Sequence, residues 1–341
     1  MLKRELLKKL FEELKSAENP FVFYDDDPDG MISFVLIKKR FGHFSGTVVK
    51  GAPCLDESYA SKADDNSADK VIVLDKPMLS SGFVDNVNAQ IIWVDHHEPQ
   101  KVPKKVSYFN PRIHNPKDIS PTSYMIYKAV GGPLWLAMCG VVSDWYVCPE
   151  LKKLSKEMPD LLPKVESPPQ ILYGTGFGKL IRMVDFLIKK NTSDINKSVN
   201  DLLRISSPTD ILERETPEGE RIYENFEAIN KEYEPLLKKA LEKDDKNLLL
   251  FTYGGMKRSF TSELSNELLE KASSRLIIVA RKKDGAFKMS IRSRDIVLPP
   301  LIKKALRGID GYGGGHEHAC GANIPVSDFN KFVEGLKEGL K

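Results

Sequence analysis

Short apolar runs that end in an acidic residue are the first pattern along the chain. Residues 21–24, 71–74 and 91–94 are apolar throughout, and the aspartates that follow them are Asp25, Asp75 and Asp95. Runs of this kind are typical of parallel strands that are buried on both faces of a sheet. Polar or helical stretches separate them, and residues 2–16 repeat leucine at helical spacing. The pattern predicts an α/β fold built on a doubly wound, mainly parallel sheet.

The hydrophobic pattern changes twice further along the chain. Prolines interrupt a basic stretch after residue 149, and residues 181–243 are helical in pattern and heavily charged. From residue 248 onward the order is strand, helix, two strands and a helix, followed by a glycine-rich segment at 311–315 that we expect to be a turn. We therefore predict domains at 1–180 and 244–341, the second a smaller α/β domain, joined by a helical connector at 181–243.

Composition narrows the class of protein. The chain has 341 residues, 41% of them apolar and 29% charged, which suits two packed domains and excludes general disorder. The formal net charge of +3 argues neither for nor against a polyanionic partner. The four cysteines are scattered without a C-x-x-C pair, so we expect a reducing cytoplasm and no disulfide framework. The charged amphipathic start is unlike a signal peptide, and no apolar run is long enough for a membrane span.

Four carboxylates are crowded into residues 25–29, directly after the first apolar run. Asp25, Asp27 and Asp29 alternate along the chain, so they can share one side of a turn. Like charges at this density repel one another, and a divalent cation such as Mn²⁺ or Mg²⁺ would relieve the repulsion. An acidic surface turn held by Asx-type hydrogen bonds remains the alternative.

Histidines follow the third acidic strand end. Asp95, His96 and His97 are consecutive, and four of the six histidines fall in two tight groups, the second at His316 and His318. Because the carboxyl ends of parallel strands share one edge of a sheet, this tripeptide should lie beside the first acidic cluster. Neutral imidazole favours Mn, Fe or Zn over Mg. Adjacent residues point to opposite sides of an extended chain, so we expect different roles for His96 and His97.

Several motifs in the right order resemble the DHH phosphoesterase superfamily, in its RecJ-like nuclease branch and compact archaeal type. The first is the Asp-x-Asp-x-Asp-Gly of residues 25–30, and VIVLD ending at Asp75, Asp95-His96-His97 and GVVSD ending at Asp144 follow. Near the end of the chain, residues 314–321 are similar to the signature of the DHH-associated substrate domain, and residues 290–293 to the strand before it. The helical middle carries no comparable signature.

The resemblance implies a catalytic domain at the amino-terminal end with two Mn²⁺ ions, or Mg²⁺ or Co²⁺ in their place. The implied metal ligands are Asp27, Asp29, Asp75, His96 and Asp144, with Asp75 bridging the ions. His97 would face the scissile phosphate and Asp95 would orient a neighbouring imidazole. In other branches a histidine lies four residues before the position of Asp27; here that residue is Phe23, so Asp25 is a candidate for the missing ligand.

Substrate contacts are expected from the second domain. Glycines let backbone N–H groups approach a phosphate closely, which indicates Gly313, Gly314 and Gly315, and His316 could donate to a phosphate or sugar. Arg292 offers a bidentate phosphate contact. Arg112, after a strand-like SYF, is a further candidate for a phosphate contact. An ordinary turn is the alternative for the glycines and for the segment around Arg112.

The sequence thus favours a Mn²⁺-dependent phosphodiesterase with its active site between two domains. The first hypothesis is an exonuclease that releases mononucleotides from single-stranded DNA or RNA or from short oligonucleotides. A small-molecule phosphoesterase acting on a phosphoadenosine phosphate or a cyclic dinucleotide is the second, and a catalytically silent replication scaffold is the third. A replication or repair protein is a candidate partner, and the sequence leaves the oligomeric state, the sugar and the direction of digestion open.

Overall fold

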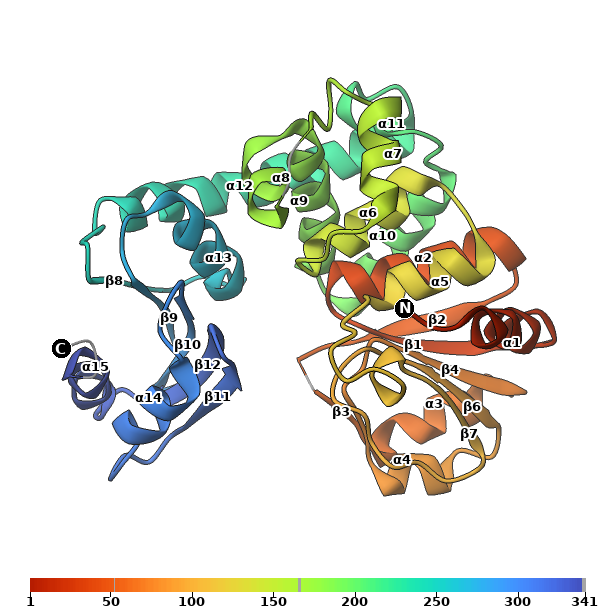
Figure 1. Ribbon diagram of the computed structural model, residues 1–341, viewed down its shortest axis with the longest axis horizontal. Coiled ribbons are helices and arrows are strands. Elements are labelled where there is room, and N and C mark those ends of the chain that lie inside the picture. Colours follow the sequence, from red (N-terminus) through yellow and green to blue (C-terminus); the bar gives the residue numbers. More distant parts are fainter. Residues whose placement is uncertain (52, 165–166, 339–341) are drawn as a thin grey trace. The chain divides into compact units, whose positions relative to one another are not determined.

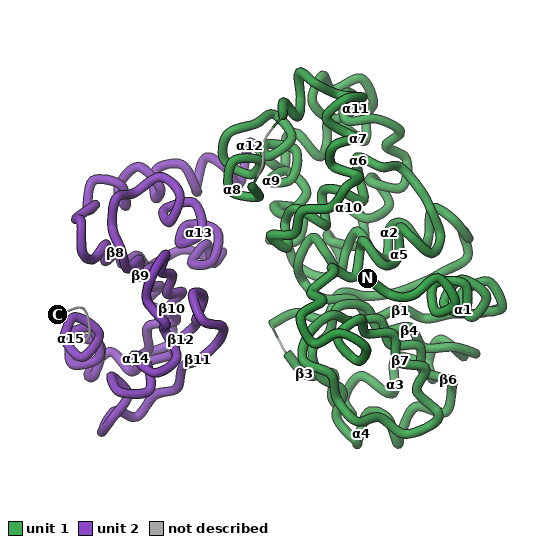
Figure 2. The backbone as a smooth tube through the Cα atoms, viewed as in Figure 1, with its two compact units in different colours: residues 1–226 green, residues 227–341 purple. Residues whose placement is uncertain are grey.

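The computed structural model describes residues 1–51, 53–164 and 167–338, and the chain forms two compact units. Unit 1 spans residues 1–226 and unit 2 spans residues 227–341, as Figure 2 shows in green and purple. Within the described ranges, no helix combines the length and apolar character needed to cross a membrane.

A five-stranded parallel sheet forms the centre of unit 1. Its strands are β1 (Phe21–Asp25), β2 (Ser45–Val49), β4 (Lys70–Leu74), β6 (Gln90–Val94) and β7 (Val106–Phe109). They lie in the order β2-β1-β4-β6-β7, and every neighbouring pair is parallel. The predicted parallel sheet is therefore confirmed, and the three acid-terminated runs are its central strands.

Helices cover both faces of this sheet (Figure 1). On one face α2 (Pro28–Phe41) packs against β1 and contacts α5 (Thr122–Val130) and α6 (Leu134–Ser143). On the other face lie α3 (Ala60–Asp65) and α4 (Ser81–Asn86), whose Ala63 and Phe83 join a core with Phe23 and Trp93. Burial of this apolar area, worth about 25 cal/mol per Å², holds the layers together.

The remaining elements of unit 1 are helical or short. The helices are α1 (Arg4–Lys15), α7 (Pro149–Glu157), α8 (Pro168–Gly174), α9 (Gly176–Ile188), α10 (Thr192–Arg204) and α11 (Pro208–Leu212). The short elements are two 3₁₀ turns (Glu57–Tyr59 and Pro111–Ile113) and the strand pair β3 (Cys54–Leu55) and β5 (Met78–Leu79). The long helix α12 (Pro217–Leu241) begins in unit 1 and ends in unit 2.

The segment 181–243, expected as a connector, is helical and largely packed. α9 and α10 contact α2, and α10 also contacts β2. Phe186, Leu187, Ile195 and Leu202 on these two helices are buried. The change from unit 1 to unit 2 falls inside α12, after residue 226.

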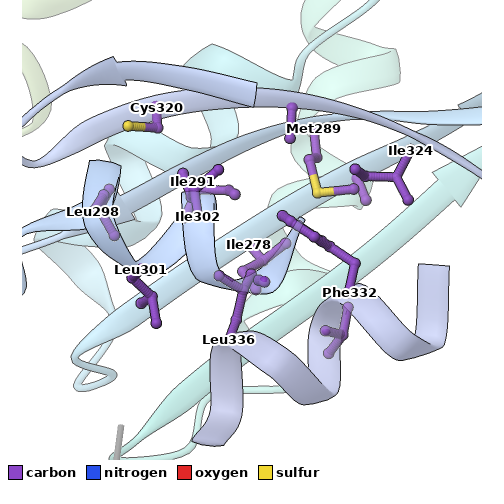
Figure 3. Close-up of a cluster of buried hydrophobic side chains, with 14 of the residues drawn as sticks. Ile278, Met289, Ile291, Leu298, Leu301, Ile302, Cys320, Ile324, Phe332 and Leu336 are labelled. Atoms are coloured by element: carbon purple, nitrogen blue, oxygen red, sulfur yellow. The ribbon is translucent and has the colours of Figure 1, made fainter. Parts of the chain in front are cut away.

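Unit 2 is a smaller α/β unit. Its elements are β8 (Leu248–Gly254), α13 (Thr261–Lys271), β9 (Leu276–Lys283), β10 (Ala286–Ser293), α14 (Leu298–Ala305), β11 (Tyr312–His316), β12 (Ala319–Pro325) and α15 (Phe329–Glu338). The sheet order is β11-β12-β10-β9-β8; β8 is parallel to β9 and the other pairs are antiparallel. α14 and α15 bury one face of it, where Ile278, Ile302 and Phe332 meet in the core drawn in Figure 3.

The glycine-rich segment is a strand, and the expectation of a turn at 311–315 was wrong. It forms most of β11, in which Gly314 pairs with Gly321 of β12. A Cβ at Gly313 would lie 2.9 Å from the Cβ of Ala322 and 3.1 Å from Ile302. Gly315 has a φ of +144°, which favours glycine. Glycine here allows close strand pairing and packing against α14 rather than a reversal of the chain.

Candidate metal centre

The carboxyl edge of the parallel sheet gathers the side chains of three strand ends in unit 1. Asp75 follows β4 and is 1% exposed, with a φ of +62° that is uncommon for a residue other than glycine. Its amide donates to the carbonyl of Val94 at the end of β6, 2.9 Å away. The Thr122 hydroxyl donates to Asp75 Oδ1 at 3.1 Å. These contacts fix the Asp75 carboxylate at the sheet edge.

Two groups of potential ligand atoms converge here. Asp75, His96 and His97 form one group, and Asp29, His96 and Asp144 form the other, with the ligand atoms in each within 4.8 Å of one another. His96 Nε2 lies 3.3 Å from Asp75 Oδ1 and 3.5 Å from Asp144 Oδ2. Asp144 reaches the centre from the carboxyl end of α6. His96 therefore belongs to both groups.

The start of α2 supplies two further carboxylates. Asp27 is the N-cap of α2 and accepts a hydrogen bond from the Gly30 amide at 2.9 Å. Asp29 lies in the first turn and is buried, and it accepts from the amides of Thr122 and Ser123 at 2.8 and 2.9 Å. Both aspartates thus satisfy amides at helix starts that have no partner within their own helix.

Electrostatics at this edge favour a bound cation. Burial, reinforced by the charges of Asp25 and Asp29, raises the pKa of Asp27 to about 7. Burial and neighbouring carboxylates also raise the pKa values of Asp75 and Asp144 well above the usual range. These carboxylates lie close together in a buried place, so their negative charges repel one another. Oxygen ligands with neutral imidazole are a donor set that Mn²⁺ accepts, so the residues present fit a divalent ion.

The two histidines differ in their surroundings. Burial lowers the pKa of His96, which keeps its ring neutral, the form that binds metals. Burial alone would lower the pKa of His97 as well, but the hydrogen bond to Asp95 and the charge of that carboxylate outweigh burial and raise the pKa. His97 Nδ1 lies 2.7 Å from Asp95 Oδ1. The two adjacent histidines thus lie in different environments, and their different roles stay a prediction.

Asp95 orients His97 from a fully buried position. Besides the ring of His97, it accepts from the His97 amide at 3.1 Å, from Asn110 Nδ2 at 3.1 Å and from the Tyr108 hydroxyl at 3.3 Å. Asn110 also donates to the His97 carbonyl at 3.0 Å. Sequence reasoning missed Asn110 and Tyr108, although both lie at or just after the end of β7, on the same sheet edge.

Asp25 is placed differently from the other acidic residues. Its Oδ1 accepts from Lys76 Nζ at 2.7 Å, and Lys76 is 1% exposed. Like Asp27, Asp25 is in neither of the two ligand groups found among the described residues, but only Asp25 is paired with Lys76. Burial raises the pKa of Asp25 and the ammonium of Lys76 opposes that rise. Lys76 was also missed; its position directly after Asp75, at a strand end, was the available signal.

Arg112 lies in a 3₁₀ turn after β7 and is engaged by neighbouring groups. Its Nη2 is 2.5 Å from Glu98 Oε2, and its Nε donates to the Pro116 carbonyl at 3.2 Å. Glu98 is largely exposed, so a phosphate would compete with a solvated partner for this guanidinium.

Three of the predicted substrate residues of unit 2, Arg292, Gly314 and His316, share one face of its sheet, whereas Gly313 and Gly315 alternate with them on β11 and lie on the core face. Arg292 pairs with Ala319, which pairs with His316, so the three form a row across β10, β12 and β11. Gly314 and Gly321 form the next row on that face, because side chains alternate along a strand. Arg292 is held from α13 by Asn266 Oδ1 at 2.6 Å and by the Ser262 hydroxyl at 3.2 Å. Gly313 and Gly315 belong to the same strand.

Comparison with known families identifies unit 2. Residues 245–341 match the DHHA1 domain. The curated proteins contain no match to the chain.

Solved structures of similar fold cover almost the entire chain. RecJ of Thermus thermophilus in complex with Mn²⁺ matches all of it at a TM-score of 0.69 and 13% identity, and the chain spans 55% of that protein. An exonuclease RecJ bound to manganese matches 99% of the chain and 95% of its own length, at a TM-score of 0.62 and 14% identity. A pGpG-specific phosphodiesterase of Vibrio cholerae matches 95% of the chain and 99% of its own length, at a TM-score of 0.51 and 14% identity.

The parallel sheet with its acidic edge and the smaller second sheet give the chain a RecJ-like fold, and residues 245–341 match the DHHA1 domain.

Proposed function

We propose that the protein is a Mn²⁺-dependent phosphodiesterase that releases mononucleotides from the end of single-stranded DNA or RNA or of short oligonucleotides. One observation carries the proposal: carboxylates and imidazoles from distant parts of the sequence form two groups of three that share His96, and the ligand atoms within each group lie within 4.8 Å of one another. The raised pKa values of Asp27, Asp75 and Asp144 add support, because a bound cation would stabilise carboxylates that are buried and close to one another.

The metal ligands in this proposal are Asp27, Asp29, Asp75, His96 and Asp144, which would hold two Mn²⁺ ions, with Mg²⁺ or Co²⁺ as substitutes. Such ions activate a water and stabilise the attacking and leaving oxygens of a phosphodiester. Asp25 is a weaker candidate for a ligand, because its carboxylate is paired with Lys76.

His97 is the proposed catalytic residue beside the metal ligands. Asp95 accepts from its Nδ1 and leaves Nε2 as the ring nitrogen available to substrate. The raised pKa of His97 increases the imidazolium fraction at neutral pH, which suits contact with an anionic phosphate. Asp95 is a positioning residue that keeps this ring oriented.

Unit 2 is the proposed substrate-binding unit. Arg292 and His316 occupy one row of its sheet and offer donors to a terminal phosphate. Gly314 leaves the surface beside them open. Arg112 in unit 1 is a second candidate for a phosphate contact.

The test is hydrolysis of end-labelled DNA and RNA of graded length with Mn²⁺, with products resolved over time. We expect mononucleotides to appear from one end. Asp75→Asn should lower the rate by about 10²-fold or more, since asparagine tolerates the left-handed backbone but binds metal weakly. His97→Ala should lower it by about 10²–10⁴-fold.

Asp284→Asn is the matched control, because Asp284 has a φ of +51° and is 81% exposed in unit 2. The Asp284→Asn variant should hydrolyse the labelled strands at the same rate as the unsubstituted protein. No turnover of any phosphoester with Mn²⁺, Mg²⁺ or Co²⁺ would reject the proposal in favour of a scaffold.

A small-molecule phosphoesterase is the second candidate. The fold similarity to a pGpG-specific phosphodiesterase, over nearly the full length of both chains, favours it. Cleavage of dinucleotides or nucleotides without cleavage of longer strands would select this candidate over the exonuclease.

A further inference from the structure

Unit 2 contains a pocket of about 500 Å³ on the open face of its sheet. It lies along β10, β12 and β11, and its lining includes Ser259, Thr261, Lys288, Tyr312, Gly314 and Asn323. The helix α13 packs on β9 and β10 (Figure 1). A volume of this size suits a nucleotide-sized ligand.

The floor of the pocket is flat because of two paired glycines. Gly314 pairs with Gly321, a Cβ at Gly314 would meet nothing within 4 Å, and one at Gly321 would meet only a carbonyl at 3.6 Å. On one side of this floor lies the row of Arg292 and His316. On the other side Lys288 pairs with Asn323, and Asn323 pairs with Tyr312. The two rows therefore flank one continuous open surface.

Tyr312 presents an aromatic ring at this surface. It is 70% exposed, the highest value among the large exposed hydrophobic residues in the described ranges. Asn323 Nδ2 lies 3.3 Å from its hydroxyl and holds the ring beside the pocket. The other end of that amide, Oδ1, is buried and has no hydrogen-bond partner among the described residues. A buried polar atom without a partner is a place where a ligand donor would be accommodated.

Positive charge and hydroxyl groups adjoin the aromatic ring. Lys288 is exposed on the same row of the sheet, and Ser259 and Thr261 line the wall at the start of α13. An ammonium with two hydroxyls suits a phosphate, whereas an aromatic face with an amide suits a nucleobase. The pocket thus combines the two kinds of group that one nucleotide requires.

We propose that this pocket binds the second nucleotide of a single-stranded nucleic acid, with its base stacked on Tyr312 and its phosphate at Lys288. This inference rests on the proposed function, in which Arg292 and His316 hold the terminal nucleotide. His316 lies four residues after Tyr312 on the same strand, a span of roughly 13 Å at about 3.3 Å per residue, which leaves room for the adjacent nucleotide. Asn323 is its polar contact to the base.

Equilibrium binding of a fluorescein-labelled oligothymidylate to the full chain in EDTA tests the pocket without hydrolysis. Tyr312→Ala should weaken binding at least about fivefold, and Tyr312→Phe should retain most of it, because stacking needs the ring. Lys288→Ala should lower the slope of log Kd against log salt by about 0.7. Lys303→Ala is the charge-matched control on α14, at the opposite face, and should leave the slope unchanged.

The outcomes separate this inference from the proposed function. Unchanged binding in Tyr312→Ala and Lys288→Ala overturns the pocket, even if the protein digests oligonucleotides. Undetectable binding by the unsubstituted protein also overturns it. Binding that depends on Tyr312 and Lys288 without any hydrolysis upholds the pocket and rejects the exonuclease. A rise in KM for oligonucleotides in Tyr312→Ala, with kcat kept, supports both.

Discussion

At the scale of single residues, the arrangement of charge around Asp25 departs most from what the sequence motif implies. The motif places Asp25 among the carboxylates of a metal site, yet the buried ammonium of Lys76 lies 2.7 Å from it. A buried charge is tolerated when it is paired, and removal of one partner leaves the other uncompensated. Lys76 therefore neutralises one member of the acidic group by itself.

Replacement of Lys76 by methionine tests this pairing. Lys76→Met should lower the free energy of unfolding of the metal-free protein at pH 8 by about 1–3 kcal/mol, less than for a fully buried pair, because Asp25 is 20% exposed. The measurement is urea unfolding followed by tryptophan fluorescence, since all three tryptophans, Trp93, Trp135 and Trp145, lie in unit 1. The double variant Asp25→Asn/Lys76→Met should recover part of the loss, and additive losses would argue against coupling.

The raised pKa of Asp27 predicts a pH-dependent effect of Mn²⁺. With a folded-state pKa of about 7 against an ordinary value of 3.8, the metal-free folded protein retains a proton that the unfolded chain has lost. That stabilisation is complete at low pH and is lost as the pH rises through about 7. Mn²⁺ needs the deprotonated carboxylate, so its stabilising effect should grow from pH 6 to pH 8.

Unfolding midpoints with and without Mn²⁺ at pH 6, 7 and 8 measure this effect. Asp27→Asn should reduce the pH dependence, because it removes the titrating carboxyl group. An equal Mn²⁺ effect at all three pH values would contradict the assignment of Asp27 to the metal centre.

At the scale of elements, the start of α2 is fixed by its approach to β1. A Cβ at Gly30 would lie 2.7 Å from the backbone nitrogen of Asp25 and 2.9 Å from its oxygen. The helix can begin this close to the strand end because residue 30 has no side chain. Asp27 and Asp29 lie within the three residues before this glycine, so their positions depend on the same contact.

Gly30→Ala should therefore destabilise unit 1 by about 1–3 kcal/mol and weaken Mn²⁺ binding. Gly174→Ala is the matched control, because Gly174 ends α8 and a Cβ there would meet nothing within 4 Å. The control should be neutral or slightly stabilising. Thermal unfolding at several Mn²⁺ concentrations reports both effects, and equal behaviour of the two variants would contradict this account of α2.

The sequence predicted some strands of the two sheets and failed to predict others. The central strands β1, β4 and β6 were found because they are continuously apolar and buried on both faces. β2, with the sequence SGTVV at a sheet edge, carries too little apolar pattern to be recognised. β11 was taken for a turn because its glycines fit either state, and only pairing with β12 decides between them.

At the scale of the whole molecule, the chain consists of two units with separate cores. The candidate metal ligands all lie in unit 1, and the core around Ile278 and Phe332 lies in unit 2. A ligand that binds one folded unit stabilises that unit by mass action. Because the two cores are separate, we expect a ligand of one unit to raise the unfolding midpoint of that unit alone.

Mn²⁺ should raise the unfolding midpoint detected by tryptophan fluorescence. Phe332→Ala should cost unit 2 about 3–5 kcal/mol and leave that midpoint unchanged, since Phe332 is fully buried in unit 2 and the tryptophans are in unit 1. Calorimetry should then show two transitions, of which only one moves with Mn²⁺. A single transition that moves as a whole in both experiments would show that the units unfold together.

The local pattern of the sequence is enough to place several polar side chains at strand ends. Apolar runs that stop at Asp25, Asp75 and Asp95 place polar groups at the carboxyl edge of any parallel sheet, since that edge is where such strands end. His96 and His97 follow by adjacency along the chain. Asp144, at the end of a helix, was found only through the resemblance to a family, because nothing in its local pattern leads to the same place.

Which of these groups meet, and which already have a partner, depends on how the chain folds in three dimensions. The order β1-β4-β6 brings Asp75 beside His96, and α6 delivers Asp144 to the same point. The pairing of Asp25 with Lys76 and the support of Asp95 by Asn110 also arise from contacts between separate strand ends. Local sequence encodes the period and the ends of elements, whereas the neighbours of a side chain depend on how the sheet is ordered and packed.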